Sequence, residues 1–481
     1  MTDTAIGLPA LERRIAKDLE ILAYPNKPWV RPVPHRSGRQ VYDAVIVGAG
    51  QGGLGTAFGL LREHVRNILV IDARDDGEEG PWMTYARMPT LRTVKELIGP
   101  DNDQAGVTFR SWYEAQHGAA GWDALVRVPR EAWMDYLRWF RRVLCVPVRN
   151  GTRVVDIAPD DGLIRVEVAC AGGGDVLLAR KVVMQTGLEG SGEPAMPTGL
   201  WEHLPRHLWA HTSDRDIDWA RLKGGRVGVL GAGASAFDNA IVAAEHGAAS
   251  VDVFARREEL PRVNFMRGIE FTGFFRHFGD LDDLDRWRFM RRVYSLQVPP
   301  PPDTYARAIA APGLRFHPGC PWRATRPSGK AVMVETALGS FEFDRIVFGT
   351  GFSQDVSLRP ELATILGVAA RWRDRFVPPA GEDDPVLARQ PYLGRSYEFT
   401  EREPGAAPWL RHVRFCSSGS WVSMGPTMAG LNGMKFGLGR LVAGLCRDLF
   451  REDAAWHYES YLAYDTPELT AAMPSRSGGG G

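Results

Sequence analysis

The sequence predicts an α/β fold with two Rossmann-like modules, because the same order of elements occurs twice along the chain. Apolar residues 41–47 lead into a glycine-rich turn and an amphipathic run, and residues 226–230 do the same. Each copy closes on a similar strand, VVMQTG at 182–187 and IVFGTG at 346–351. A long helical stretch expected at about 427–450 should return to the first module. We therefore expect the second module to be inserted into the first.

The first glycine turn is predicted to bind a dinucleotide. Gly48, Gly50 and Gly53 fit G-x-G-x-x-G between a strand and a helix. In this pattern the first glycine permits the tight turn, the second lets the backbone approach a pyrophosphate, and the third lets the helix pack on the strand. The N–H groups at the start of the helix then hold the phosphates. Asp72 ends the next strand, where a carboxylate would bond the ribose hydroxyls of an adenosine.

The second glycine turn differs in the residues that follow it. Gly231, Gly233 and Ala236 fit the G-x-G-x-x-A variant, but the next strand ends in Arg256 and Arg257 rather than in an acid. Guanidinium groups bind a 2′-phosphate, which a carboxylate would repel. This turn therefore predicts NADPH rather than NADH, with a solvated arginine pair as the alternative. Together the two turns indicate a flavoenzyme that holds FAD in the first site and NADPH in the second.

Composition excludes several classes of protein. The 481 residues carry no net charge, which argues against nucleic acid as a partner. The chain has no run of about 18 apolar residues for a membrane span and no apolar leader at its start. Five widely spaced cysteines without a CxxC pair indicate a cytoplasmic protein and argue against zinc, any other metal centre or a dithiol. The tail SRSGGGG is expected to be disordered.

The expected domains follow from the repeat. They are an N-terminal extension at 1–40, an FAD-binding domain at 41–203 and 352–481, and an NADPH-binding domain at 204–351 with a helical insertion at about 258–320. Within the second domain, FEFDRIVFGTG at 341–351 is expected to form one strand.

The sequence resembles the single-component (class B) flavoprotein monooxygenases, which include flavin-containing monooxygenases, Baeyer–Villiger monooxygenases and amine N-hydroxylases. The resemblance covers roughly residues 41–450 and rests on GAGQGG at 48–53, GPW at 80–82, HTS at 211–213, GAGASA at 231–236 and GTGF at 349–352. It implies that NADPH reduces FAD, that O₂ adds to form a C4a-(hydro)peroxyflavin, and that one oxygen atom passes to a substrate.

The resemblance and the turns together predict the cofactor contacts. They are Gly48, Gly50, Gln51, Gly53, Asp72, Ala73, Arg74, Trp82, Arg92, His211, Gly231, Gly233, Ala234, Ser235, Ala236, Arg256, Arg257, Thr350 and Gly351. His211 is expected to orient the link between the domains rather than to act as a base.

Four residues are candidates for contacts with the substrate or the reactive intermediate. Arg87 and Lys95 follow Trp82 and could hold an anionic substrate, as could Arg92 from the cofactor contacts above, although all three could equally bind cofactor or be solvated. Asn264 lies where N-hydroxylases place an amide, with a loop cap as the alternative. Arg291 could anchor a carboxylate or lie on a solvated helix face.

The favoured function is N-oxygenation of an amine or amino acid, with an acidic one such as aspartate suited to the arginine-rich loop. Baeyer–Villiger enzymes tend to have an Asn-Arg pair and an early Asp after G-x-W, whereas here Ala86 precedes Arg87 and no Asp follows before Asp101. Baeyer–Villiger insertion, sulfur oxygenation, an NADPH oxidase or reductase, and a non-enzymatic nucleotide sensor remain as alternatives. The expected partners are a small-molecule substrate and O₂, and a homo-oligomer is left open.

Overall fold

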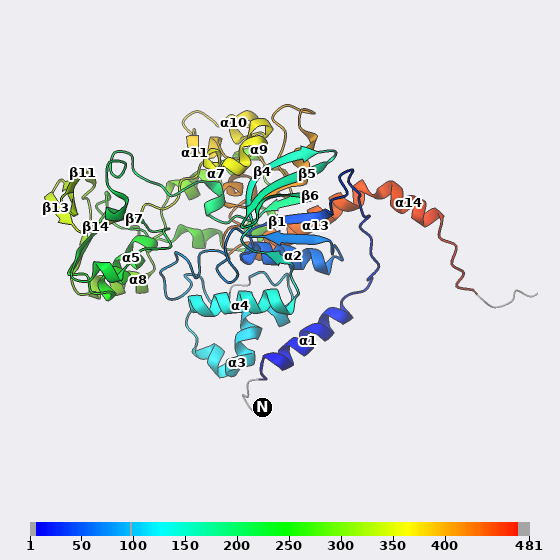
Figure 1. The fold of residues 1–481 in the computed structure, drawn as a ribbon, viewed down its shortest axis with the longest axis horizontal. Coiled ribbons are helices and arrows are strands. Elements are labelled where there is room, and N and C mark those ends of the chain that lie inside the picture. The colour runs from blue at the N-terminus through cyan, green and yellow to red at the C-terminus, as the bar shows by residue number, and fades with distance from the viewer. Residues whose placement is uncertain (1–5, 97–98, 470–481) are drawn as a thin grey trace, which may run out of the picture.

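The computed structural model describes residues 6–96 and 99–469, so the SRSGGGG tail lies outside the described residues. Figure 1 shows two bodies side by side, the first module with strands β1, β4, β5 and β6 and the second with β7, β11, β13 and β14. The predicted α/β fold with two Rossmann-like modules is confirmed. No helix within the described residues is long and apolar enough to cross a membrane.

The first module is built on a seven-stranded sheet in the order β3-β2-β1-β6-β5-β4, with β15 paired to β6. Its strands are β1 (Val41–Val47), β2 (Ile68–Ile71), β3 (Val148–Arg149), β4 (Arg153–Asp160), β5 (Leu163–Cys170), β6 (Gly173–Met184) and β15 (Val413–Phe415). Strands β1, β2, β3, β15 and the end of β6 are parallel, whereas β4 and β5 are antiparallel to their neighbours. The carboxyl ends of β1, β2 and β6 therefore meet at one edge.

The second module has a five-stranded parallel sheet in the order β10-β9-β8-β14-β7. Its strands are β7 (Trp209–His211), β8 (Arg226–Leu230), β9 (Ser250–Phe254), β10 (Leu314–His317) and β14 (Arg345–Phe348). The segment 258–320, expected to be a helical insertion, ends in β10, which pairs with β9 and so completes this sheet.

A small antiparallel sheet corrects the expectation of one strand over residues 341–351. It comprises β11 (Trp322–Ser328), β12 (Ala331–Thr336) and β13 (Gly339–Phe343). The expected strand breaks at Asp344, because β13 pairs with β12 while β14 pairs with β7 and β8. Because apolar residues occur on both sides of Asp344, the sequence pattern does not show this break.

Helices cover the sheets and fill the connections. They are α1 (Leu8–Ile21), α2 (Gln51–Arg62), α3 (Phe109–Ala124), α4 (Arg130–Val143), α5 (Ala234–Glu245), α6 (Thr272–His277), α7 (Asp283–Ser295), α8 (Pro302–Ala310), α9 (Ala363–Val368), α10 (Trp372–Arg375), α11 (Pro385–Ala388), α12 (Trp421–Met424), α13 (Met434–Glu452) and α14 (Ala454–Leu462). Figure 1 shows α14 extending away from the body of the first module.

Helix α13 returns the chain to the first module, as expected, but it begins at Met434 rather than near 427. The chain folds back on itself just before the helix, since a Cβ on Gly433 would lie 2.7 Å from the Cα of Thr427. The helix packs closely on α2, where a Cβ on Gly55 would lie 2.6 Å from Leu438. This contact holds the helix that follows the first glycine turn.

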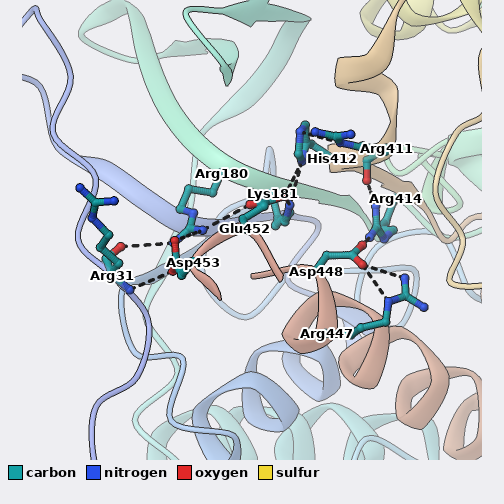
Figure 2. Close-up of polar contacts among 10 residues, drawn as sticks. All are labelled: Arg31, Arg180, Lys181, Arg411, His412, Arg414, Arg447, Asp448, Glu452 and Asp453. Carbon is teal, nitrogen blue, oxygen red and sulfur yellow. Dashed lines mark hydrogen bonds and ion pairs between the residues drawn. The ribbon is translucent and has the colours of Figure 1, made fainter. Parts of the chain in front are cut away.

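A buried cluster of charged residues joins the end of α13 to strands β6 and β15 (Figure 2). Both Arg180 and Asp453 have side chains only 5% exposed, and two bonds of 2.9 and 3.0 Å join them. Asp453 also accepts a hydrogen bond from the backbone N–H of Arg31 in the N-terminal arm. The cluster therefore ties three distant segments of the chain together.

Further pairs extend this cluster along the same strands. Lys181 on β6 bonds Glu452 and lies 2.7 Å from Nδ1 of His412. Arg414 on β15 bonds Asp448 on α13. Burial raises the free energy of a charged lysine and thereby lowers the pKa of Lys181 to about 8. The carboxylate of Glu452 acts in the opposite direction and raises this pKa.

Replacing Asp453 with Ala should lower the free energy of unfolding by about 3–5 kcal/mol, because it leaves the Arg180 guanidinium buried with only part of its partners. Chemical denaturation of the flavin-loaded protein measures this loss. Glu459→Ala on α14 is the control, since Glu459 is exposed. Equal stability of the two variants would contradict the role of the cluster.

One buried carboxyl makes stability depend on pH. Asp101 is 1% exposed, and its Oδ2 has no hydrogen-bond partner among the described residues. Burial raises the pKa of Asp101 to about 7, because the charged form loses its hydration. A carboxyl with a raised pKa in the folded state stabilises the fold at low pH, and this contribution is lost as the pH rises through 7.

Asp101→Asn should therefore raise the melting temperature relative to wild type more at about pH 8.5 than at about pH 5.5. In the wild type, Asp101 accepts a hydrogen bond of 3.2 Å from the N–H of Asp103, and the amide oxygen of the variant can accept the same bond. Thermal denaturation across this pH range tests the prediction. A gain that is equal at both ends of the range would show that Asp101 does not titrate in it.

Candidate active site

A cavity of about 1910 Å³ lies between the two modules and reaches both glycine turns. Pockets for a single small ligand usually measure about 300–1,000 Å³, so this cavity has room for more than one ligand. Its walls come from the loop at 80–93, the segments at 184–189 and 193–197, the hinge at 349–353 and the segment at 429–432. The carboxyl ends of the parallel strands supply the turns, as in other doubly wound folds.

The first turn is set by a close backbone contact. Gly48 has a φ of 106°, and a Cβ there would lie 2.4 Å from the carbonyl oxygen of Gln185. In front of Gly50 a Cβ would meet no described atom within 4 Å, so this space is open to a phosphate. Asp72 accepts hydrogen bonds from the N–H groups of Ala49 at 2.7 Å and Arg74 at 2.8 Å. These bonds hold the carboxylate at the edge of the turn.

The second turn repeats this geometry. Gly231 has a φ of 122°, and a Cβ there would lie 2.3 Å from the carbonyl oxygen of Gly349. The space in front of Gly233 is open in the same way. Thr350 donates its hydroxyl to the carbonyl of Ala195, which ties the hinge between the modules to the neighbouring loop. Both turns therefore fit the phosphates of a dinucleotide.

The arginine pair after β9 is free to bind a ligand. Arg256 and Arg257 are exposed and line the cavity beside the second turn. Neither guanidinium makes a hydrogen bond or ion pair with another of the described residues. Both side chains are therefore available for a 2′-phosphate.

Most of the predicted cofactor contacts meet at this cavity. Those that line it are Gly48, Gly50, Gln51, Asp72, Ala73, Arg74, Trp82, Arg92, Gly231, Gly233, Ala234, Ser235, Arg256, Arg257, Thr350 and Gly351. Gly53 and Ala236 lie behind the turns instead, where they allow the helices to pack on the strands, and a Cβ on Gly53 would overlap the carbonyl of Gly48.

His211 also lies outside the cavity wall, in strand β7 next to β14. Its Nδ1 lies 2.6 Å from the hydroxyl of Ser213, and burial lowers the pKa of its imidazole. Its neighbours Thr212 and Ser213 line the cavity. That His211 orients the link between the modules stays a prediction.

The structure does not bring the four candidate substrate contacts together. Only Arg87 lines the cavity, and its guanidinium donates to the backbone carbonyls of Thr84, Asp214 and Arg215. Lys95 donates to the carbonyl of Trp122 at 2.6 Å, away from the cavity.

The other two candidates have structural partners. The Oδ1 of Asn264 accepts a hydrogen bond of 3.2 Å from the N–H of Met266. This contact corresponds to the alternative expectation that Asn264 caps a loop. Arg291 on α7 donates to the carbonyl of Gly381 at 3.0 Å. Neither residue lines the cavity, although the same segment, 258–295, contributes Leu260 and Pro261 to its wall.

Sequence reasoning missed Asp238, the partner of Arg92. Asp238 is 2% exposed on α5, and its Oδ2 accepts from Arg92 at 2.7 Å. The signal was an acid in the otherwise apolar run ASAFDNAIVAA, on a helix that packs against a sheet. Its partner lies 146 residues earlier in the chain, which no local pattern reveals.

Comparison with known proteins identifies the family. A model of FAD-NAD(P)-binding domains matches residues 45–189. The chain is 45% identical to the FAD-dependent urate hydroxylase of Xanthomonas campestris pv. campestris over 471 residues, which are 98% of each protein. The chain belongs to the single-component flavoprotein monooxygenases. This flavoprotein monooxygenase uses FAD and NADPH, which the two open turns and the free arginine pair fit.

More distant proteins share the architecture of this monooxygenase. L-ornithine N(5)-oxygenase of Arthrobotrys oligospora is 26% identical over 254 residues, covering 47% of this chain and 49% of that protein. The structure of an ornithine N-hydroxylase from Kutzneria sp. 744 aligns with a TM-score of 0.67 at 18% identity, covering 85% of this chain and 99% of the other. At that identity the likeness shows the fold alone.

Replacing both Arg256 and Arg257 with Ala should raise the KM for NADPH and leave the KM for NADH nearly unchanged. Each charge-assisted bond to a phosphate contributes about 1.5–3 kcal/mol, or roughly 10- to 150-fold in affinity. Steady-state kinetics with both nucleotides measures the change. Equal losses for NADPH and NADH would show that the pair does not bind the 2′-phosphate.

Proposed function

We propose that this monooxygenase hydroxylates urate or a closely related oxidised purine. The observation that carries the proposal is the 45% identity, over 98% of both chains, to an FAD-dependent urate hydroxylase. The match includes both glycine turns and the segments between them, so it covers the cavity as well as the cofactor sites. The unpaired state of all five cysteines also supports the proposed cytoplasmic location.

In the proposed reaction, one oxygen atom of O₂ enters the purine and the other leaves as water. NADPH supplies a hydride, and a proton comes from solvent. FAD, when bound, would supply the redox chemistry that couples hydride transfer from NADPH to the reduction of O₂. The protein contributes binding, orientation and a site from which water is excluded.

Each part of the cavity has a role in this proposal. The backbone N–H groups at the starts of α2 and α5 bind the phosphates of the two dinucleotides, with Asp72 on a ribose of the first. The apolar side chains of Trp82, Met88 and Leu91 come from the loop at 80–93 and line the cavity between the two turns. They exclude water from the space beside them. A planar purine suits such apolar walls.

N-hydroxylation of an amine or amino acid is the second candidate. The fold shared with ornithine N-hydroxylase and the partial match to an L-ornithine N(5)-oxygenase support it. However, Lys95, Asn264 and Arg291, the groups expected to hold an amino acid, have backbone partners away from the cavity. We therefore place it second.

Urate should stimulate NADPH oxidation by the flavin-loaded enzyme, with about one hydroxylated purine formed per NADPH consumed. Under ¹⁸O₂ the product should carry one labelled oxygen, because the oxygen comes from O₂ and not from water. Mass spectrometry of the product checks both points, with L-ornithine, L-lysine and L-aspartate as parallel substrates. Oxygenation of an amino acid, but not of urate, would overturn the proposal in favour of the second candidate.

A further inference from the structure

An ion pair crosses from the first module to the second at the cavity wall. Arg92 belongs to the loop of the first module, and Asp238 lies on α5 of the second module. Their side chains meet at 2.7 Å, with Asp238 buried and Arg92 38% exposed. This is the single hydrogen bond of the Arg92 side chain within the described residues. Most of its N–H groups therefore remain available on the cavity side.

Four other cations that line the cavity lie at the two dinucleotide ends. Arg74 and Arg153 flank Asp72 at the adenosine end of the first site, since the N–H of Thr152 bonds the carbonyl of Asp72. Arg256 and Arg257 stand beside the second turn.

Two further arginines make more hydrogen bonds within the protein than Arg92 does. Arg87 donates to three backbone carbonyls. Arg359 donates through Nε and Nη2 to Glu361 at 2.9 and 2.6 Å. Within the described residues, Arg92 is thus the cavity cation outside the dinucleotide ends with the most free donors, because its side chain makes one hydrogen bond, against three for Arg87 and two for Arg359.

The anionic groups of the two dinucleotides also have donors elsewhere. Their pyrophosphates fit the helix starts in front of Gly50 and Gly233, and the 2′-phosphate fits the arginine pair. The one remaining anion of the proposed reaction is its substrate. Urate is a monoanion at neutral pH, and its oxygens and ring nitrogens lie in a plane that suits the planar fork of a guanidinium.

We infer that Arg92 binds the anionic purine and that Asp238 is the positioning residue that holds the Arg92 guanidinium toward it. The inference rests on the proposed function and adds the residue that recognises the charge of the substrate. Arg92 touches the substrate, whereas Asp238 acts through Arg92.

The contact with Arg92 explains why an acid occupies this buried position. Its Oδ1 has no hydrogen-bond partner among the described residues, so Arg92 provides its main compensation. A buried carboxylate without other partners costs stability, and an apolar residue would pack there more favourably. The pair fixes one side of the guanidinium and leaves the other side for a ligand. It also makes the position of the substrate depend on the second module.

Binding measured without turnover tests this assignment. Urate and NADP⁺ are titrated separately into oxidised, flavin-loaded enzyme, and the flavin absorbance reports each Kd. Arg92→Gln should weaken urate binding about 10- to 100-fold and leave the Kd for NADP⁺ within about twofold. Arg92→Lys should recover only part of the loss, because an ammonium group lacks the planar fork. Flavin content and melting temperature show that each variant is folded.

The positioning role of Asp238 needs a matched control. Asp303→Asn removes a second ion pair between the modules, Arg127 with Asp303 at 3.8 Å, which lies outside the main cavity. Asp238→Asn should raise the KM for urate with a smaller change in kcat, whereas Asp303→Asn should change neither. Asp238→Glu should restore part of the urate affinity, because it keeps the negative charge.

The outcomes separate the two levels of the proposal. If wild-type enzyme neither binds nor oxidises urate, the proposed function is wrong. If it binds urate and Arg92→Gln binds equally well, only the assignment of Arg92 is wrong. A loss of NADP⁺ affinity instead of urate affinity would assign Arg92 to the nucleotide and overturn the inference. Equal effects of Asp238→Asn and Asp303→Asn would show that the pair merely joins the modules.

Discussion

Both cofactor sites depend on one steric constraint, the contact between the first glycine of each turn and a backbone carbonyl of the neighbouring strand end. A Cβ would lie 2.4 Å from the carbonyl oxygen of Gln185 at Gly48, and 2.3 Å from that of Gly349 at Gly231. Both glycines have positive φ angles, which a residue with a side chain adopts at a cost. The contact brings two strand ends together and directs the following helix start toward the cavity. The geometry of phosphate binding follows from it.

The placement of the two modules depends on a different set of contacts, which come from the loop after β2. Arg87 donates to carbonyls at 214 and 215, and Arg92 pairs with Asp238. Glu78 accepts two hydrogen bonds of 2.5 Å from Arg215. Since this loop also carries Trp82 and Leu91 of the cavity wall, the same residues that join the modules shape the space between them.

The charges in the cavity distinguish the two candidate functions. An amino acid requires a cation for its carboxylate, and two residues expected to supply it, Lys95 and Arg291, have backbone partners elsewhere. A purine anion requires one cation beside apolar walls, and we propose that Arg92 supplies it beside Trp82 and Leu91, which line the same cavity. This difference is the reason why the proposed function places urate before an amino acid.

The sequence by itself determined the two modules, their glycine turns and the acid and arginine ends of their second strands, because each is encoded within about 30 contiguous residues. Local patterns could not separate β13 from β14 or add β10 to the sheet, since the partners of these strands lie far away in the chain. The same reason explains the substrate residues. The candidate arginines, the lysine and the amide looked alike in the sequence, and only the tertiary structure decided which of them had free donors. Arg87 and Lys95 are occupied by backbone carbonyls, whereas Arg92 is held by a buried acid 146 residues away and remains open to the cavity.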